Sequence, residues 1–265
     1  MAETTEMPEF GTLLVELGED HVLTVTLNRP ERLNAFNQQT IGDFAALWRY
    51  AAREDAVHVV VLQAEGERAF CTGVDVVEGI DRSSNPFSDS DPGTSLSPKL
   101  NRCWKPLVCA VHGMAAGGAL YWLNEADIII ASEDATFFDP HTTYGMVAAL
   151  EPIGLARRIP IGEVLRMVLL GNDERMSARR ALEIGFVSEV VDRERLRERA
   201  HELAARIAAK PPAAVQGSVK AIWESLDASR SQALATGLSY TQIGNPIGTA
   251  QVDRATFKGH PFEVR

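Results

Sequence analysis

Two places where a strand meets glycines and turns toward a helix are the parts of this sequence best suited to chemistry. In the first, the apolar run 106–111 is followed by Gly113, Gly117 and Gly118, and then by a helix-compatible segment near 119–124. Backbone N–H groups at the start of a helix have no partner within it, so they favour negative charge, including charge that develops during a reaction. Gly118 lacks a Cβ, so a ligand carbonyl can approach its backbone closely.

The second place is the stretch 69–76, Ala-Phe-Cys-Thr-Gly-Val-Asp-Val. It follows a predicted buried strand and a turn at Gly66, it leads toward a short helix expected to begin near Asp75, and it offers a backbone N–H at Val74. Two N–H groups directed at one oxygen form an oxyanion hole, in which a single donor contributes about 3–4 kcal/mol to a transition state. Glycine spacing alone fits close helix–strand packing equally well.

Other kinds of site that use glycine or histidine do not fit this sequence. A dinucleotide-binding turn has the pattern G-x-G-x-x-G, which the spacing of Gly113, Gly117 and Gly118 does not match. A phosphate-binding loop ends in Gly-Lys-Ser/Thr, which does not occur. No histidine follows His201-Glu202 where a zinc motif needs one, so no metal is expected.

Composition favours a large globular protein. The chain has 265 residues, of which 45% are hydrophobic, so it can bury a sizeable core as one large domain or as one domain with an appendage. A net charge of −10 with no basic stripe argues against nucleic-acid binding. The acidic N-terminus is not a signal peptide, and the apolar runs are too short for a membrane span. Three cysteines indicate reduced thiols, so a cytoplasmic protein is expected.

The remaining patterns predict repeated strand–turn–helix units followed by a helical end. Strands over 12–17 and 21–27 form a hairpin, a helix over 38–53 is capped by Asn37, and a buried strand covers 57–63. Segment 83–98 is rich in Ser, Pro, Asp and Gly and is expected to be irregular. The charged run 192–199 reads as a solvated helix face. Beyond Pro211, helices are expected over 213–226 and 229–238, so we place the boundary near Lys210, with a core over 1–210 and a helical region over 211–265.

Several motifs together resemble the crotonase (enoyl-CoA hydratase/isomerase) superfamily, and the resemblance covers nearly the whole chain. They are A-F-x-x-G-x-D at 69–75, K-P-x-x-x-x-V-x-G-x-x-x-G-G at 105–118 and D-I-x-I-A-S-E-D-A-x-F at 127–137. Asn28-Arg29-Pro30 with Leu33-Asn34-Ala35, and the segment 181–190, add to the match. The resemblance implies an α/β fold, a crotonase-like spiral of repeated ββα units with a helical C-terminal region that trimerises.

The resemblance also implies an acyl-CoA ligand, with coenzyme A arriving as part of the substrate and no permanently bound cofactor. It implies that Val74 and Gly118 hold the thioester oxygen as an enolate develops, in a lyase or isomerase of the kind that serves fatty acid metabolism. A homotrimer or a dimer of trimers is expected. Candidate contacts to the coenzyme A portion are Arg32, near the family's basic position, Ala69, Cys71 and Thr72, with Phe257 and Lys258 as weaker ones. Segment 83–98 could form one wall of the acyl pocket.

Two departures from the family pattern concern the acid and the base. Hydratases of this family carry a glutamate three residues after the oxyanion glycine, where this chain has Tyr121, and a second after the proline that ends the third motif, where it has His141. Histidine, with a reference pKa of about 6.5, is suited to be a general base. The alternative is a partly buried histidine bonded to a backbone carbonyl, and the family position favours the functional interpretation. We expect Tyr121 to line the pocket or to hydrogen-bond a ligand, together with Trp122. Glu151 could orient His141, act as the base itself, or be a solvated glutamate at a helix start.

Three functional hypotheses follow from these residues. The first is an acyl-CoA lyase or isomerase that uses the oxyanion hole with His141 as acid and base. The second is a hydrolase in which His141, aided by Glu151 or Asp139, activates water against a C–C or thioester bond. The third is a binding protein that keeps the acyl-CoA pocket without catalysis. We rank them in this order. Cys71 is expected to be a packed side chain and not a nucleophile.

Overall fold

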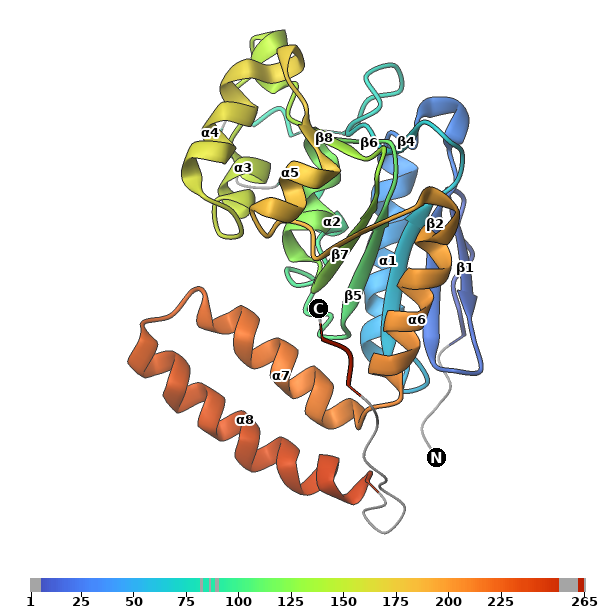
Figure 1. Cartoon of the computed structure of the whole chain (residues 1–265), viewed down its shortest axis with the longest axis vertical. Helices are drawn as coiled ribbons and strands as arrows, with labels where there is room; N and C mark the ends of the chain where they lie inside the picture. Colours follow the sequence, from blue (N-terminus) through green and yellow to red (C-terminus); the bar gives the residue numbers. More distant parts are fainter. Residues whose placement is uncertain (1–5, 82, 86, 89–90, 253–261, 265) are drawn as a thin grey trace. The chain divides into compact units, whose positions relative to one another are not determined.

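The computed structural model of the chain describes residues 6–81, 83–85, 87–88, 91–252 and 262–264 (Figure 1). It divides into two compact units, Met1–Ala208 and Ala209–Arg265. Phe257 and Lys258 lie outside the described residues. Among the described residues, no helix has both the length and the apolar character needed to cross a membrane.

A six-stranded sheet forms the centre of the first unit, in the order β1-β2-β3-β5-β7-β10. Strands β1 (Leu13–Leu17) and β2 (Val22–Leu27) pair antiparallel, which confirms the predicted hairpin. The other neighbours pair in parallel. Those strands are β3 (Val59–Ala64), β5 (Leu107–Val111), β7 (Ile128–Ser132) and β10 (Glu189–Val191). Strand β3 is a nearly continuous apolar run because helices cover both of its faces.

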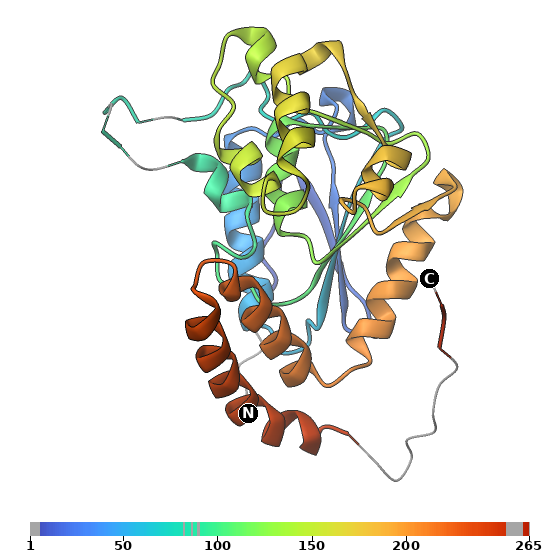
Figure 2. The same ribbon diagram turned by 60° about the vertical axis from the view of Figure 1, so that its left-hand side comes forward.

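Helices pack on both faces of this sheet, as the view in Figure 2 shows. Helix α6 (Leu196–Ala208) places Leu196, Ala200 and Ala204 against one face. Helix α1 (Gln38–Arg53) lies on the other, and its bounds agree with the prediction. The predicted cap is confirmed, since the Asn37 side chain accepts a hydrogen bond from the Thr40 N–H at 3.0 Å.

A second, four-stranded sheet has the order β4-β6-β8-β9. Its strands are β4 (Ala69–Cys71), β6 (Met114–Ala116), β8 (Thr136–Phe138) and β9 (Met176–Ser177). Each of β4, β6 and β8 follows a strand of the first sheet along the chain. This alternation is the repeated ββ step that the family resemblance implied. Because β4 and β6 pair in parallel, the segments that follow them emerge at the same edge.

Short helices complete the first unit. They are α2 (Leu120–Glu125), α3 (Leu150–Leu155), α4 (Ile161–Leu170) and α5 (Ala178–Glu183). The prediction of a short helix near Asp75 is wrong. The segment forms a turn instead, in which the Asp75 side chain accepts the N–H groups of Val77 and Glu78. Within the segment predicted to be irregular, Pro92–Leu96 forms a 3₁₀ helix capped by Asp91.

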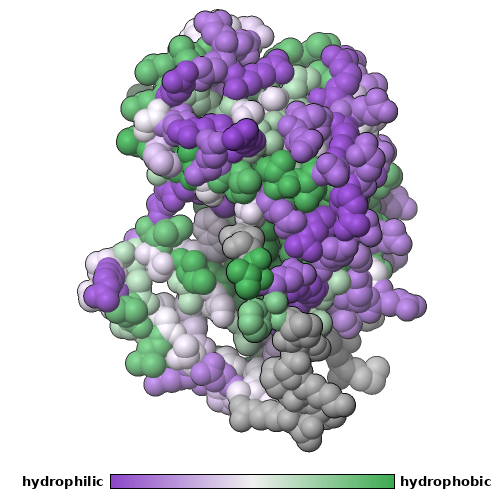
Figure 3. All heavy atoms as spheres, in the orientation of Figure 1, coloured by the Kyte–Doolittle hydropathy of each residue, from purple (hydrophilic) through white to green (hydrophobic). Residues whose placement is uncertain are grey.

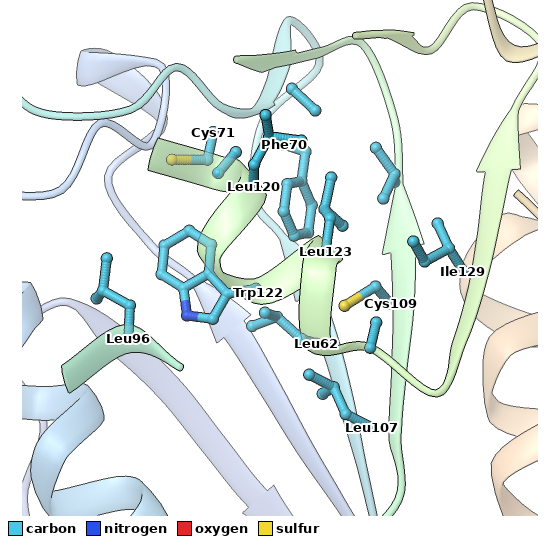
Figure 4. Packing of buried hydrophobic residues seen from close by; sticks show 14 of the residues in the cluster. Leu62, Phe70, Cys71, Leu96, Leu107, Cys109, Leu120, Trp122, Leu123 and Ile129 are labelled. Atoms are coloured by element: carbon cyan, nitrogen blue, oxygen red, sulfur yellow. The ribbon is translucent and has the colours of Figure 1, made fainter. Parts of the chain in front are cut away.

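The core of the first unit includes the indole of Trp122. Figure 4 shows it near Leu62 and Leu96. The side chain is fully buried, and its ring lies 4.8 Å from the ring of Phe44 between centroids. Trp122 therefore packs in the core, so the prediction that it lines the pocket is wrong.

The surface of the first unit is charged over α6 and apolar over α4. Purple atoms cover the outer side of α6 in Figure 3, where Arg195 and Arg199 pair with Glu202. The run 192–199, predicted to lie on one helix, spans a 3₁₀ helix over Arg193–Arg195 and the start of α6, and it carries such pairs. Helix α4 exposes Ile161, Leu165 and Leu169.

The second unit consists of the helices α7 (Pro212–Ser225) and α8 (Arg230–Ala250), which pack against each other. Helix α8 begins at a capping box on Ser229 and extends well beyond the predicted 229–238. The prediction ended it early because it contains Gly237, Gly244 and Pro246, residues that weaken helices. Both helices expose apolar side chains, including Ile222 and Leu238. Trimerisation through this unit stays a prediction.

His112, at the corner between β5 and β6, should make the fold sensitive to acid. It is 5% exposed, its Nε2 has no partner among the described residues, and burial, aided by the charge of Arg193, lowers its pKa from 6.5 to about 4. The unfolded chain protonates this histidine first, so stability is lost as pH falls from 6.5 to about 4. His112→Gln should remove that loss of about 3 kcal/mol, measured by urea denaturation at several pH values. An unchanged acid loss in this variant, with exposed His201→Gln as the control, would contradict the assignment.

Candidate active site

The two glycine-containing junctions that follow β4 and β6 lie against each other. A Cβ on Gly73 would lie 3.2 Å from both the Ala116 O and the Gly118 N, and Gly73 also has φ +88°. A Cβ on Gly118 would lie 2.4 Å from Cε1 of Phe36. Gly73 is therefore favoured by its left-handed φ and its close approach to the second junction, and a side chain on Gly118 would collide with the Phe36 ring.

The backbone around Val74 leaves its N–H unused. Phe36 pairs with Val74 in a single parallel bridge, in which the Phe36 N–H donates to the Gly73 O at 2.9 Å and the Asp75 N–H donates to the Phe36 O at 2.8 Å. Among the described residues, neither the Val74 N–H nor the Gly118 N–H donates a backbone hydrogen bond. The pairing turns the Val74 N–H away from Phe36. This donor and the N–H of Gly118 lie on the two adjoining junctions.

Arg29 and Asn34 hold the first junction in place. The guanidinium of Arg29 donates to the Ala35 O at 2.5 Å and to Asp75 Oδ2 at 3.0 Å. Asn34 Nδ2 donates to the Ala69 O at 2.9 Å. Sequence reasoning assigned no role to these two residues, although both stand in motifs that carried the family resemblance.

The candidate contacts to coenzyme A occupy different environments. Cys71 is fully buried, its Sγ accepts the Gly73 N–H at 3.3 Å, and burial raises the pKa of this thiol to about 12, as expected for a packed side chain. Ala69 is buried, and Thr72 is half-buried. Arg32 ends a 3₁₀ helix over Pro30–Arg32 and is exposed.

His141 follows β8 and is held by a buried carboxylate. Oδ1 of Asp139 accepts the His141 N–H at 3.0 Å and lies 2.6 Å from Nδ1 of the same histidine. The Asp139 side chain is 0% exposed and that of His141 is 23% exposed. The Nδ1 partner is thus a carboxylate and not the backbone carbonyl considered from the sequence. We assign the Nδ1 proton to this bond, which leaves Nε2 as the proton acceptor.

Glu151 faces the other nitrogen of this imidazole. Its Oε1 lies 4.0 Å from Nε2 of His141, and the residue is 8% exposed. Burial raises the pKa of this carboxyl, the charge of His141 lowers it, and the charges of Asp139 and Asp91 raise it further. Of the alternatives considered for Glu151, the solvated glutamate is therefore wrong, and Glu151 belongs to the cluster around His141.

This cluster adjoins the second junction. A Cβ on Gly117 would lie 3.7 Å from Cε1 of His141 and 3.5 Å from Cδ of Pro140. The imidazole is thus a neighbour of the residue that precedes Gly118. The structure therefore brings His141 to Gly117, with Glu151 on the other side of the imidazole.

Tyr121, one turn further along α2, is bonded within the protein. Its hydroxyl donates to Oδ2 of Asp91 at 2.6 Å. The loop that carries Asp91 packs closely on the ring, since a Cβ on Gly93 would lie 2.4 Å from Cζ of Tyr121. Sequence reasoning missed Asp91 because it stands in a Ser-, Pro- and Asp-rich segment with no periodic signal.

The described part of the chain contains no group of three or more His, Cys, Asp or Glu side chains that could hold a metal ion. His201, considered and set aside as a zinc ligand, instead lies 2.9 Å from Oδ2 of Asp20.

Comparisons with known proteins identify the family of the chain. The family model described as Enoyl-CoA hydratase/isomerase matches residues 18–243. The (E)-benzylidenesuccinyl-CoA hydratase of Thauera aromatica is 34% identical over 208 residues, which cover 76% of this chain and 78% of that protein. The (7aS)-7a-methyl-1,5-dioxo-2,3,5,6,7,7a-hexahydro-1H-indene-carboxyl-CoA hydrolase of Rhodococcus jostii is 32% identical, covering 90% of this chain and 91% of that protein.

Solved structures give the same result for the fold. The crystal structure of an enoyl-CoA hydratase/isomerase from Mycobacterium paratuberculosis matches with a TM-score of 0.82 and 36% identity, and covers 93% of each chain. The α/β crotonase-like fold implied by the motifs is thereby confirmed, and the chain belongs to the enoyl-CoA hydratase/isomerase family.

Proposed function

We propose that this protein acts on an acyl-CoA thioester by stabilising an enolate, with His141 as the group that transfers a proton at Cα. The observation that carries the proposal is the place of His141. Its imidazole adjoins Gly117, the residue before Gly118, while the buried Asp139 lies at its Nδ1. A base at this position needs an acceptor for the negative charge that it creates, and the two adjoining backbone segments offer one.

The backbone N–H groups of Val74 and Gly118 are the proposed oxyanion hole. When a proton leaves Cα, negative charge moves to the thioester oxygen, where two fixed donors stabilise it without reorganisation. Asp139 holds the imidazole in one tautomer, so that neutral His141 accepts a proton through Nε2 and protonated His141 returns it. Glu151, 4.0 Å from Nε2, stabilises the protonated form.

The coenzyme A portion is proposed to approach the first junction. Arg32 offers an exposed cation, and Thr72 a half-buried side chain. Because the Cys71 thiol is buried and the Ala69 O accepts a hydrogen bond from Asn34, contacts from these two residues would come from other backbone atoms.

The ligand class can be tested by calorimetry. Acyl-CoA thioesters such as butyryl-CoA are expected to bind more tightly than coenzyme A alone or NAD, because only a thioester reaches both N–H donors. The same titrations on a protein without this fold serve as the control for unspecific heat. Binding of NAD with no response to butyryl-CoA would remove the proposal and revive the dinucleotide alternative.

A hydrolase is the second candidate. It is favoured by the similarity to the Rhodococcus jostii hydrolase and by the Asp139–His141 pair, which has the geometry of a base that activates water. Mass spectrometry of the products in H₂¹⁸O separates the two functions, because hydrolysis of a thioester or C–C bond places ¹⁸O in a carboxylate.

A further inference from the structure

Tyr121 and Asp91 form a second polar pair at the same site. They lie on different elements. Tyr121 is on α2, and Asp91 caps the 3₁₀ helix Pro92–Leu96. Oδ2 of Asp91 accepts a hydrogen bond from the Tyr121 hydroxyl, with 2.6 Å between the two oxygens, and Oδ1 of Asp91 accepts the Gly93 N–H at 3.1 Å. The carboxylate is thereby fixed on both oxygens.

This bond decides what the Tyr121 oxygen can offer to a substrate. A tyrosine hydroxyl has one proton and two acceptor lone pairs. Since the proton is donated to Asp91, the oxygen can only accept a hydrogen bond from another molecule, such as a water or a substrate hydroxyl. It can then give up its own proton to Asp91 as it receives one.

The pair lies close to the cluster around His141. Tyr121 stands three residues after Gly118, and α2 packs against α3, where Asn124 Nδ2 donates to the O of Glu151 at 2.7 Å. The charge of Asp91 also reaches the Glu151 carboxyl, whose pKa it helps to raise. Two proton-handling pairs therefore stand near the same backbone donors.

We propose that Tyr121 is a second catalytic residue and Asp91 its positioning residue, and that together they accept a proton from the water that adds to an enoyl thioester. This inference rests on the proposed function. In this proposal, Tyr121 and Asp91 take the role of the base that hydratases of the family pattern carry at the position of Tyr121. His141 supplies the proton to Cα.

The reaction balances as follows. A water oxygen forms a bond to Cβ, its proton passes to Oη of Tyr121, and the Tyr121 proton passes to Oδ2 of Asp91. The π electrons of the Cα=Cβ bond move toward the thioester to give the enolate, and Cα then takes a proton from protonated His141. The product is the 3-hydroxyacyl thioester, and Asp91 returns its extra proton to His141 through solvent.

Two substitutions test the pair while keeping its packing. Tyr121→Phe keeps the ring against Gly93, and Asp91→Asn keeps an oxygen that can cap the 3₁₀ helix. Each is expected to lower kcat for hydration of crotonyl-CoA by about 10²-fold, the lower range for a positioned acid or base, with little change in KM. Because the two residues act as one unit, the double variant should be no slower than the slower single variant. Tyr50→Phe, which removes the hydroxyl of a buried tyrosine on α1, is the matched control.

A second readout separates this inference from the proposed function. Exchange of the Cα hydrogens of butyryl-CoA in D₂O requires His141 and the two N–H donors but no addition of water. Tyr121→Phe and Asp91→Asn should therefore keep the wild-type exchange rate while losing hydration.

Four results would overturn the pair. Hydration could be unchanged in both variants, the effects could multiply in the double variant, exchange and hydration could fall together, or the wild type could exchange Cα hydrogens without hydrating crotonyl-CoA. A wild type that binds butyryl-CoA but neither exchanges its Cα hydrogens nor turns over any enoyl-CoA would reject the proposed function itself.

Discussion

Replacing His141 with alanine is expected to lower kcat by about 10²–10⁴-fold, the usual contribution of a positioned acid or base. The substitution removes the imidazole that adjoins Gly117 and leaves Asp139 and Glu151 without it. The rate of Cα hydrogen exchange in butyryl-CoA, followed by mass spectrometry in D₂O, is the direct measurement. Binding should survive, because the donors at Val74 and Gly118 are backbone groups.

His201→Ala is the matched control for this experiment. His201 is an exposed histidine that pairs with Asp20, so its removal is expected to leave the exchange rate unchanged. Wild-type exchange in the His141→Ala protein would exclude His141 as the proton-transfer group, and Glu151 would be the next base to test.

The second large effect is expected for Gly118→Ala. The added Cβ would lie 2.4 Å from Cε1 of Phe36, a buried ring that meets Trp122 edge-on with centroids 6.0 Å apart. The Phe36 ring is enclosed in the core, with the residue 1% exposed, and its backbone is bonded to Gly73 and Asp75 on either side of Val74. Both N–H donors should therefore be displaced. We expect kcat to fall about 10²–10³-fold and the free energy of unfolding to fall by about 1–3 kcal/mol.

The control for this prediction is Gly162→Ala on α4, where a Cβ would meet nothing within 4 Å. A glycine replaced at an open helical position is expected to leave kcat unchanged and to raise the free energy of unfolding by about 0.4–1 kcal/mol. The interpretation of Gly118 fails if its alanine variant matches this control in kcat and in urea denaturation.

Local signals predicted the elements whose structure depends on nearby residues. Helix α1 combines a 3.6-residue apolar period with a cap at Asn37, so both its ends could be located from the sequence. The hairpin of β1 and β2 was predicted because a short polar turn joins two apolar strands. Helix α8 was cut short because Pro246 and its glycines lower intrinsic helix propensity, which packing against α7 overrides.

The polar partners in the site could not be predicted in the same way. Asp91 and Tyr121 are 30 residues apart, and no periodicity relates them. Asp139 stands two residues before His141, but its carboxylate reaches Nδ1 only through the turn that Pro140 forms. The burial of Glu151 depends on how α3 packs on α2. Because glutamate is polar, nothing in the sequence indicated this burial. The family motifs located Val74 and Gly118 because backbone donors at tight junctions need glycines, which the sequence shows directly.

At this site, backbone groups and side chains have different proposed roles, and this difference affects how the chain can evolve. The N–H of residue 74 is present with any residue except proline, so mutation at Val74 leaves that donor in place, whereas position 118 must stay glycine. The proposed proton-handling groups, by contrast, are side chains on separate elements, at His141, Glu151, Tyr121 and Asp91. If the proposal holds, mutation can exchange those groups one at a time while the proposed oxyanion hole persists. One ancestral scaffold can thus pass between related reactions through intermediates that already bind the same class of thioester.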